Sequence, residues 1–148
     1  TATFNGSGVA TVTLNAGATA GRAFTVGASV TLGGSARTAT TGNLTVVAGA
    51  AAAIAITPSS ATNVTAAGTQ TITVQAQDAS GNNVNANGET VTFTLTRTTG
   101  TGGTLTSGGT TNANTVTATL DANGAASITL TAGATAGDAY TVAAAVSL

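Results

Sequence analysis

The stretch that decides the fold is TATLDANGAASITLTAGATAGDAYTVAAAVSL, residues 117–148. The chain opens on nearly the same text, because residues 1–32, TATFNGSGVATVTLNAGATAGRAFTVGASVTL, align with it without a gap and are identical at 19 of 32 positions. The offset of 116 residues is far longer than one coil of a solenoid and is close to the size of one β-sandwich domain. We therefore expect a tandem repeat whose unit is a whole domain.

The composition favours a folded β-protein with a core of small side chains. Hydrophobic residues make up 42% of the chain and charged residues only 5%, whereas disordered chains are rich in charge and poor in β-branched residues. Trp, Met and Cys are absent, and there are only one Tyr and three Phe. Val, Ile, Leu and Ala must therefore fill the interior. The lack of Cys also rules out a disulfide framework.

The charge balance excludes two classes of partner. The formal net charge is −1, and three Arg cannot form a basic surface for nucleic acid or for an anionic membrane. The longest run without a polar side chain, residues 46–56, is about half of the roughly 20 residues needed to span a bilayer. We predict no nucleic-acid partner and no membrane insertion. Near-neutrality also lowers the repulsion between copies, which permits self-association.

Alternation of apolar and polar residues predicts the strands of the first copy. Two half-buried strands are expected at residues 10–16 and 24–32, with the glycines of AGATAG between them as turn residues. A further strand is expected at Leu44, Thr45, Val46 and Val47, followed by one at residues 52–57, before the single proline of the chain.

The same alternation predicts the strands of the second part of the chain. Clear strands are expected at residues 72–76 and 91–95, and a final one at residues 140–148. Residues 98–114 are rich in Gly and Thr, so we expect a long loop with one short edge strand. Residues 116–120 and 126–130 are expected to form a hairpin.

The residue types present argue against an enzyme. The chain has no His, Lys or Cys, so the usual general base, Schiff-base amine and thiolate are missing. The turns DASGNN, at residues 78–83, and DANG, at residues 121–124, supply one carboxylate each, whereas strong calcium sites use several. We expect Asp78 and Asp121 to cap turns, and we predict no catalytic residue, no metal and no cofactor.

Two surface patterns have structural explanations. Thr alternates along the expected strands, as it does on ice-binding solenoids, but here the repeat is domain-sized and a solvent-facing polar β-branched residue accounts for it. Asn-x-Ser/Thr triplets occur at Asn5, Asn43 and Asn63. They are candidate glycosylation sites that chance alone explains in a chain rich in Asn and Thr.

The turn and strand motifs resemble a known family. VQAQDASGNNVNANGETVTFTL, at residues 74–95, and LDANGAASITLTAGATAGDAYTVAAAV, at residues 120–146, resemble the bacterial Ig-like domains of the invasin and intimin type. Those domains carry an Asp-x-x-Gly-Asn turn before a Val-x-Phe strand, then an Asp-x-x-Gly turn and a final Tyr-Thr-Val strand. The resemblance implies an all-β, immunoglobulin-like β-sandwich in a tandem repeat, in an extracellular or cell-surface bacterial setting.

The resemblance also suggests how the chain is divided. Residues 50–148 match one domain, and residues 1–49 match the C-terminal part of another, including its closing strand. In the first copy the strand ending at Leu32 leads on to Leu44, Thr45, Val46 and Val47, and the second copy has no counterpart after Leu148. We therefore expect residues 50–148 to lack a closing strand.

Two arrangements could complete that sheet. Either covalent neighbours in a longer array provide the strand, or copies join head to tail and residues 44–47 of one copy are donated to the next. Both predict a non-catalytic structural module, such as a stalk, fibre or filament, whose partner is another copy or a tandem neighbour. The rival prediction is an adhesin module that binds a glycan or a host protein through residues 98–114.

Overall fold

The chain divides into two compact units, Thr1–Val47 (unit 1) and Ala48–Leu148 (unit 2). The computed structural model describes residues 1–148, except for the side chain of Asn112. The described residues contain strands, turns and irregular segments but no helix, so the all-β class is confirmed. None of them therefore forms a helix of the length and apolarity that would cross a bilayer. The division lies close to the predicted boundary after residue 49.

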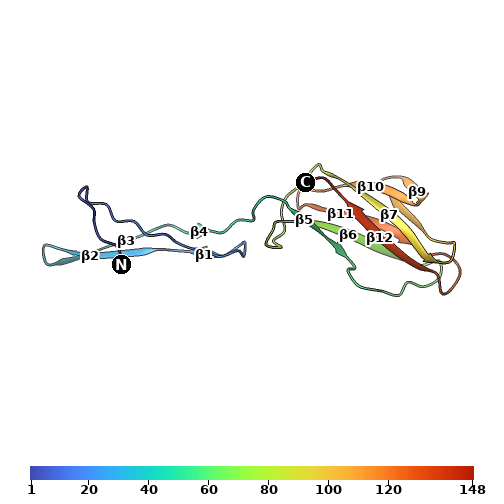
Figure 1. Ribbon diagram of the computed structural model, residues 1–148, viewed down its shortest axis with the longest axis horizontal. Coiled ribbons are helices and arrows are strands. Elements are labelled where there is room, and N and C mark those ends of the chain that lie inside the picture. The colour runs from blue at the N-terminus through green and yellow to red at the C-terminus, as the bar shows by residue number, and fades with distance from the viewer. The chain divides into compact units, whose positions relative to one another are not determined.

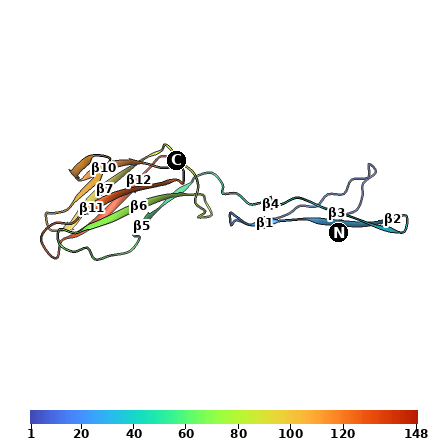
Figure 2. The same ribbon diagram turned by 180° about the vertical axis from the view of Figure 1, so that it is seen from behind.

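Unit 2 is built from two antiparallel sheets that pack face to face (Figures 1 and 2). The five-stranded sheet has the order β5-β6-β11-β8-β9, and the three-stranded sheet has the order β10-β7-β12. The strands are β5 (Ala53–Thr57), β6 (Thr69–Gln77), β7 (Thr90–Thr99), β8 (Thr104–Ser107), β9 (Thr110–Ala113), β10 (Thr115–Thr119), β11 (Ala125–Thr131) and β12 (Ala139–Ala145).

The core of unit 2 is formed by the apolar faces of these strands. Every second side chain is buried along residues 72–76 of β6, residues 91–95 of β7 and the whole of β11, as the alternation predicts. The register places Ile72 opposite Ile128, so like faces meet across the pair. The largest fully buried side chains are Val74, Val91, Phe93, Leu105 and Leu120. Aliphatic residues and one Phe therefore fill the interior, as the composition indicates.

The prediction of a long loop at residues 98–114 is wrong for much of that segment. It forms β8 and β9, and β8 pairs with β11 inside the five-stranded sheet, where Leu105 lies opposite Leu130 and is fully buried. The predicted short edge strand is β9. Before β8, the Arg97 side chain donates hydrogen bonds to the carbonyl oxygens of Gly102 and Gly103, both at 2.6 Å. These bonds fix the connection from β7.

The predicted hairpin around Asp121 is also wrong. β10 pairs with β7 and β11 pairs with β6 and β8, so the two strands belong to opposite sheets. The turn between them is tight, because the Asp121 carboxylate accepts hydrogen bonds from the backbone of Asn123 at 2.8 Å and Ala125 at 2.9 Å. Leu120, 1% exposed, is buried at this corner. The chain crosses between sheets here because both strands bury their apolar faces in one core.

Unit 1 is a set of paired strands with very little buried surface. β2 (Gly27–Leu32) pairs with β3 (Ser35–Thr40), and β1 (Ala23–Phe24) pairs with β4 (Leu44–Thr45), in both cases antiparallel. Every residue of β3 and β4 is exposed. Backbone hydrogen bonds therefore contribute most of the contacts that hold this unit together.

The predicted strand at residues 10–16 is wrong. No strand is assigned there, and residues 10–15 are exposed. Their counterpart in the repeat is β11, which lies between β6 and β8 in unit 2. Unit 1 holds no counterpart of β6 or β8, so the same alternation has no sheet to join.

Candidate functional site

One side of the β-sandwich in unit 2 is open, so that a further strand could add there. β12 is an end strand of the three-stranded sheet, and β5 is an end strand of the five-stranded sheet. Among the described residues, β12 pairs with β7 and with no other strand. An end strand presents unpaired N–H and C=O groups on its outer side, where a further strand can add.

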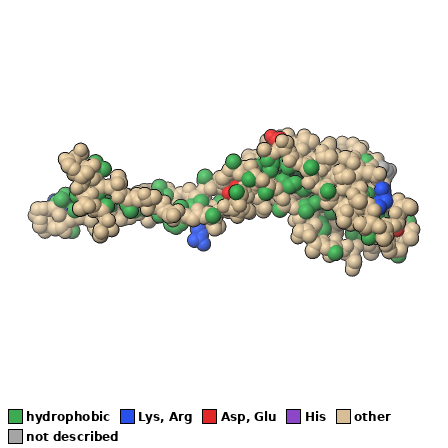
Figure 3. Space-filling view, viewed as in Figure 1, with side chains coloured by type: hydrophobic (Ala, Val, Ile, Leu, Met, Phe, Trp, Pro, Cys, Tyr) green, Lys and Arg blue, Asp and Glu red, His purple; other side chains and the backbone are tan. Residues whose placement is uncertain are grey.

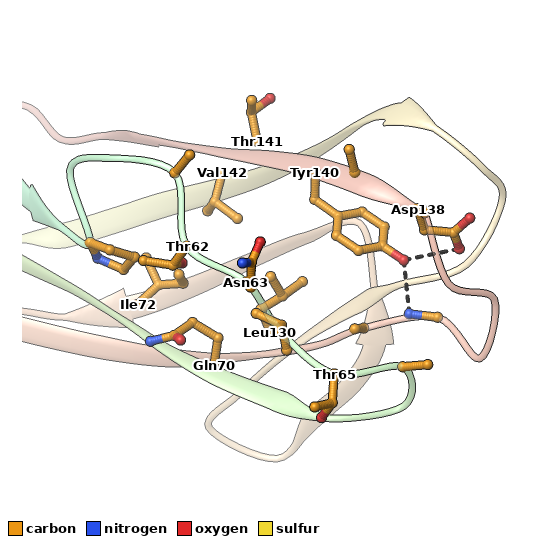
Figure 4. Close-up of a pocket in the computed structure, with 18 of the residues that line it drawn as sticks. Thr62, Asn63, Thr65, Gln70, Ile72, Leu130, Asp138, Tyr140, Thr141 and Val142 are labelled. Atoms are coloured by element: carbon orange, nitrogen blue, oxygen red, sulfur yellow. Dashed lines mark hydrogen bonds between the residues drawn. The ribbon is translucent and has the colours of Figure 1, made fainter.

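A groove of about 870 Å³ lies along this open side. We call it the edge groove and define it by Ile56 on β5, residues 58–66, Ile72, Leu130, and Tyr140 with Val142 on β12. Figure 4 shows Tyr140 and Val142 pointing towards Leu130 and Ile72, while Thr141 points away. The edge groove is therefore open to solvent but rests on the apolar core.

The β12 side chains beside the groove are only half-buried. Tyr140, Val142 and Ala144 are intermediate in exposure, whereas Val91, Phe93 and Leu95 on the neighbouring strand β7 are buried. On β12 and on β7 alike, these side chains alternate with residues that are more exposed, so each set forms the apolar face of its strand. The difference arises because β7 has a strand on each side and β12 has a strand on one side only.

Residues 58–66 form the other wall of the groove. They follow β5 and are assigned to no strand. Beyond this segment, the Ala67 backbone N–H donates to the Gly133 carbonyl oxygen and the Ala132 N–H donates to the Gly68 carbonyl oxygen, both at 2.8 Å. The segment is thus anchored at both ends, by β5 and by these two bonds, and it runs beside the groove between them.

A tyrosine lock closes one end of the groove. The Tyr140 hydroxyl accepts a hydrogen bond from the Gly133 backbone N–H at 2.8 Å and donates to the Asp138 carboxylate at 3.1 Å (Figure 4). A Cβ on Gly103 would overlap the Tyr140 ring, and one on Gly133 would crowd the Cα of Gly102. These glycines let the backbone approach the ring closely.

Sequence reasoning missed the tyrosine lock, which the two copies of the repeat do not share. Residues 22 and 24 of the first copy are Arg22 and Phe24, where the second copy has Asp138 and Tyr140. The hydroxyl and the carboxylate that meet in unit 2 therefore change together between the copies. The copies differ at 13 of 32 positions, so the contact is established by the structure and not by the repeat.

The predicted strand-donor residues lie in unit 1, paired with β1. Leu44 is opposite Phe24 and Thr45 is opposite Ala23. Val46 continues the pairing, because its N–H donates to the Arg22 carbonyl oxygen at 2.8 Å. Leu44 is 42% exposed and Val47 is 79% exposed. The strand-donor segment is thus extended and apolar on its surface.

The large exposed hydrophobic side chains gather in unit 1. Eight are exposed, and Leu148 alone belongs to unit 2; the others are Phe4, Val9, Val12, Leu14, Leu32, Leu44 and Val47. They are exposed because all the buried core residues belong to unit 2, so the apolar side chains of unit 1 have no packed layer to join. Sequence reasoning missed this feature because alternation alone predicts these residues to be buried.

The three glycosylation candidates are all exposed, but they lie in different places. Asn5 and Asn43 are in unit 1, and the Asn5 side chain accepts hydrogen bonds from the backbone of Ser7 and Val9, both at 2.9 Å. Asn63 lines the edge groove. A glycan at Asn63 would occupy the space that a docking strand needs.

The acidic side chains cap backbone turns. The Asp78 carboxylate accepts hydrogen bonds at 2.9 Å from the backbone of Gly49, Ser80 and Asn82 and from the Asn82 side chain. These bonds, the one from the Asn82 side chain first, lower the pKa of Asp78 from 3.8 to about 2. Backbone bonds from Ala125 and Asn123 likewise lower the pKa of Asp121. Among the described side chains, no three Asp, Glu, His or Cys residues lie close enough to hold a metal ion.

In comparisons with known proteins, no protein family and no curated protein matches this chain. The function is therefore inferred from the repeat, the edge groove and the exposed apolar residues of unit 1.

Proposed function

We propose that this chain is a non-catalytic structural module of an extracellular or cell-surface repeat protein, a stalk, fibre or filament whose units join end to end. One observation carries the proposal. Unit 2 has an open edge at β12 with an apolar groove beside it, while the repeat twin of β12 in unit 1 is paired with the two strands that follow it, β3 and β4. A neighbouring repeat would complete unit 2 in the same way.

The strand order supports an immunoglobulin-like assignment for unit 2. In that fold the first, second, fifth and fourth strands form one sheet, and the third, sixth and seventh form the other. β5, β6, β11 and β8 match the first set, and β7 and β12 match the third and sixth strands. The position of the seventh strand is then the open side of β12, where the edge groove lies.

The surface chemistry also favours a structural role. On the face drawn in Figure 3, charged side chains are few and widely spaced. Asp78, Asp121 and Asp138 all hold neighbouring groups of their own unit through hydrogen bonds. Carboxylates that are engaged in this way stabilise turns.

An extended chain tests this proposal. Residues 33–49 would be appended after Leu148, where they would follow β12 as they follow residues 1–32 in the first copy. We expect the melting temperature of unit 2 to rise, because the added strand would cover Val142, Leu130 and the open edge. A scrambled extension of the same composition is the control. Equal melting temperatures for the two extensions would refute the proposal.

Recognition of a glycan or host protein is the second candidate function. A glycan site normally needs an exposed aromatic platform, and the two aromatics of unit 2 do not offer one, since Phe93 is fully buried and the Tyr140 hydroxyl is engaged. Phe4, 54% exposed in unit 1, is the aromatic that such a ligand would use. A glycan array with Phe4→Ala as the control variant separates the two functions.

A further inference from the structure

We propose that the edge groove is a strand-acceptor site and that its occupant is the segment 35–47 of a second copy of this chain. The inference rests on the proposed function and specifies the partner, the segment and the register. It follows from a comparison between the two units, because unit 1 contains the pairing that the open edge of unit 2 lacks.

The repeat supplies the template. An offset of 116 residues carries β1 and β2 onto β12 and the residues that follow it, so that Ala23 corresponds to Ala139 and Ser29 to Ala145. In unit 1, Ala23 is paired with Thr45 and Ser29 with Thr38. The same register on unit 2 places Thr45 of the second copy opposite Ala139 and its Thr38 opposite Ala145.

The faces of the two strands match in this register around Tyr140. Paired residues of antiparallel strands project their side chains to the same face, and Leu44 is paired with Phe24, the twin of Tyr140. Leu44 therefore joins Tyr140 on the groove side. Thr38 and Thr45 fall opposite Ala145 and Ala139, which are exposed. Leu44 thus faces the core and the two threonines face solvent. Arg37 is paired with Val30, the twin of Val146, so it lies on the core-facing side at the other end of the segment.

Segment 35–47 would bury more apolar surface in the edge groove than it does in unit 1. In unit 1 every residue of β3 and β4 is exposed, so the pairing is sustained by backbone hydrogen bonds without a packed layer beneath it. In the edge groove, the same backbone bonds would form above Ile72 and Leu130, which are buried core residues. Exchange of partners thus keeps the hydrogen bonds and adds burial of apolar surface.

Two features of the groove wall contribute to specificity. The tyrosine lock holds the Tyr140 ring at one end of the groove, and residues 58–66 bound the opposite side. An entering strand must therefore place a side chain against Tyr140, and in the transferred register that side chain is Leu44.

Disulfide trapping between copies tests the register. The chain has no cysteine, so single substitutions report only the intended contact. Full-length Ala145→Cys is mixed with full-length Thr38→Cys, and Ala139→Cys with Thr45→Cys. The exchanged mixtures, 145 with 45 and 139 with 38, are matched controls that use the same four exposed sites. In these controls the cysteines are six residues out of register along β12, roughly 20 Å apart, and a disulfide needs Cα atoms within about 7 Å.

We expect the in-register pairs to form mixed disulfide dimers at least tenfold faster than the exchanged pairs, by mass spectrometry of an isotope-labelled mixture. Equal rates for the two sets, or no mixed dimer in either set, would overturn the proposal. Circular dichroism of the four variants verifies that each is folded. A synthetic peptide of residues 33–47 that carries the Thr38→Cys substitution repeats the test on the Ala145→Cys chain. If neither the peptide nor the full-length chain reacts in register, the edge groove is not a strand-acceptor site.

The outcome is separable from that of the proposed function. If the appended segment 33–49 stabilises unit 2 while the in-register pairs fail to cross-link, the module is completed by a covalent neighbour and the second-copy inference is wrong. If the pairs cross-link but the appended segment has no effect on the melting temperature, it is the end-to-end completion of unit 2 that is refuted.

Discussion

Leu105→Ala is the sharpest test of how unit 2 is built. The residue lies on β8, in a segment rich in Gly and Thr, and its side chain is fully buried opposite Leu130. The substitution removes three carbon atoms. At about 0.8 kcal/mol for each buried carbon the lost transfer energy is about 2.4 kcal/mol, and the cavity term brings the expected loss of unfolding free energy to roughly 3–4 kcal/mol.

Urea denaturation followed by tyrosine fluorescence measures this loss. The chain has a single Tyr and no Trp, and Tyr140 lies in unit 2, so the signal reports on that unit alone. A destabilisation of about 3 kcal/mol corresponds to a fall in melting temperature of roughly 12 °C or more for a domain of about 100 residues. Leu14→Ala is the matched control, since Leu14 is 42% exposed in unit 1 and lies outside segment 35–47. It should change the unfolding of unit 2 by less than about 0.5 kcal/mol.

A loss below about 1 kcal/mol for Leu105→Ala would refute the reasoning, because burial of a leucine side chain is worth more than that. Residues 104–107 would then behave as a surface loop, as the composition alone suggests, and β8 would not belong to the core. A loss in the expected range for Leu105→Ala, together with an equal loss for Leu14→Ala, would show that the two units do not unfold independently.

Three further predictions follow from single contacts. Tyr140→Phe should destabilise unit 2 by about 1–2 kcal/mol in urea denaturation followed by circular dichroism, because the Gly133 N–H and the Asp138 carboxylate lose their partner; Phe24→Tyr should have no such effect. Because the folded pKa of Asp78 is lowered to about 2, its contribution to stability is present above about pH 4 and is lost as the pH falls towards 2. Asp78→Asn should therefore flatten the dependence of the urea midpoint on pH in that window, and an unchanged slope would count against the turn cap. Gly124→Ala should destabilise unit 2 by about 2 kcal/mol or more, because Gly124 has a φ of 73° and a Cβ would overlap a carbonyl oxygen; Gly42→Ala, in open space, is the control.

The strands that sequence reasoning predicted correctly are those with large apolar residues at every second position. In β6 and β7 the side chains of Ile72, Val74, Phe93 and Leu95 alternate with threonine or glutamine, and each is buried. A strand whose two faces differ so clearly can bury only one of them. The sequence therefore determines both the strand and the face.

The strand β8 could not be predicted in this way. It offers one large apolar residue, Leu105, between threonines and glycines, and a single apolar residue has no period. What places it in the sheet is β11, whose backbone pairs with it. The edge groove escaped prediction for a similar reason, since its wall at residues 58–66 has no regular pattern and is defined by the strands around it.

The two copies of the repeat show how far local pattern decides structure. Residues 125–131 and their twins, residues 9–15, share the alternation ATVTL or ASITL, yet the first set forms β11 between two strands and the second is exposed and assigned to no strand. Propensity is the same in both, so the difference comes from the presence of sheet partners. The same reasoning applies to the segment 35–47, which is extended and largely exposed in unit 1. A strand of that kind takes the structure of whichever edge it joins, and β12 is an end strand of unit 2 with a core beneath it.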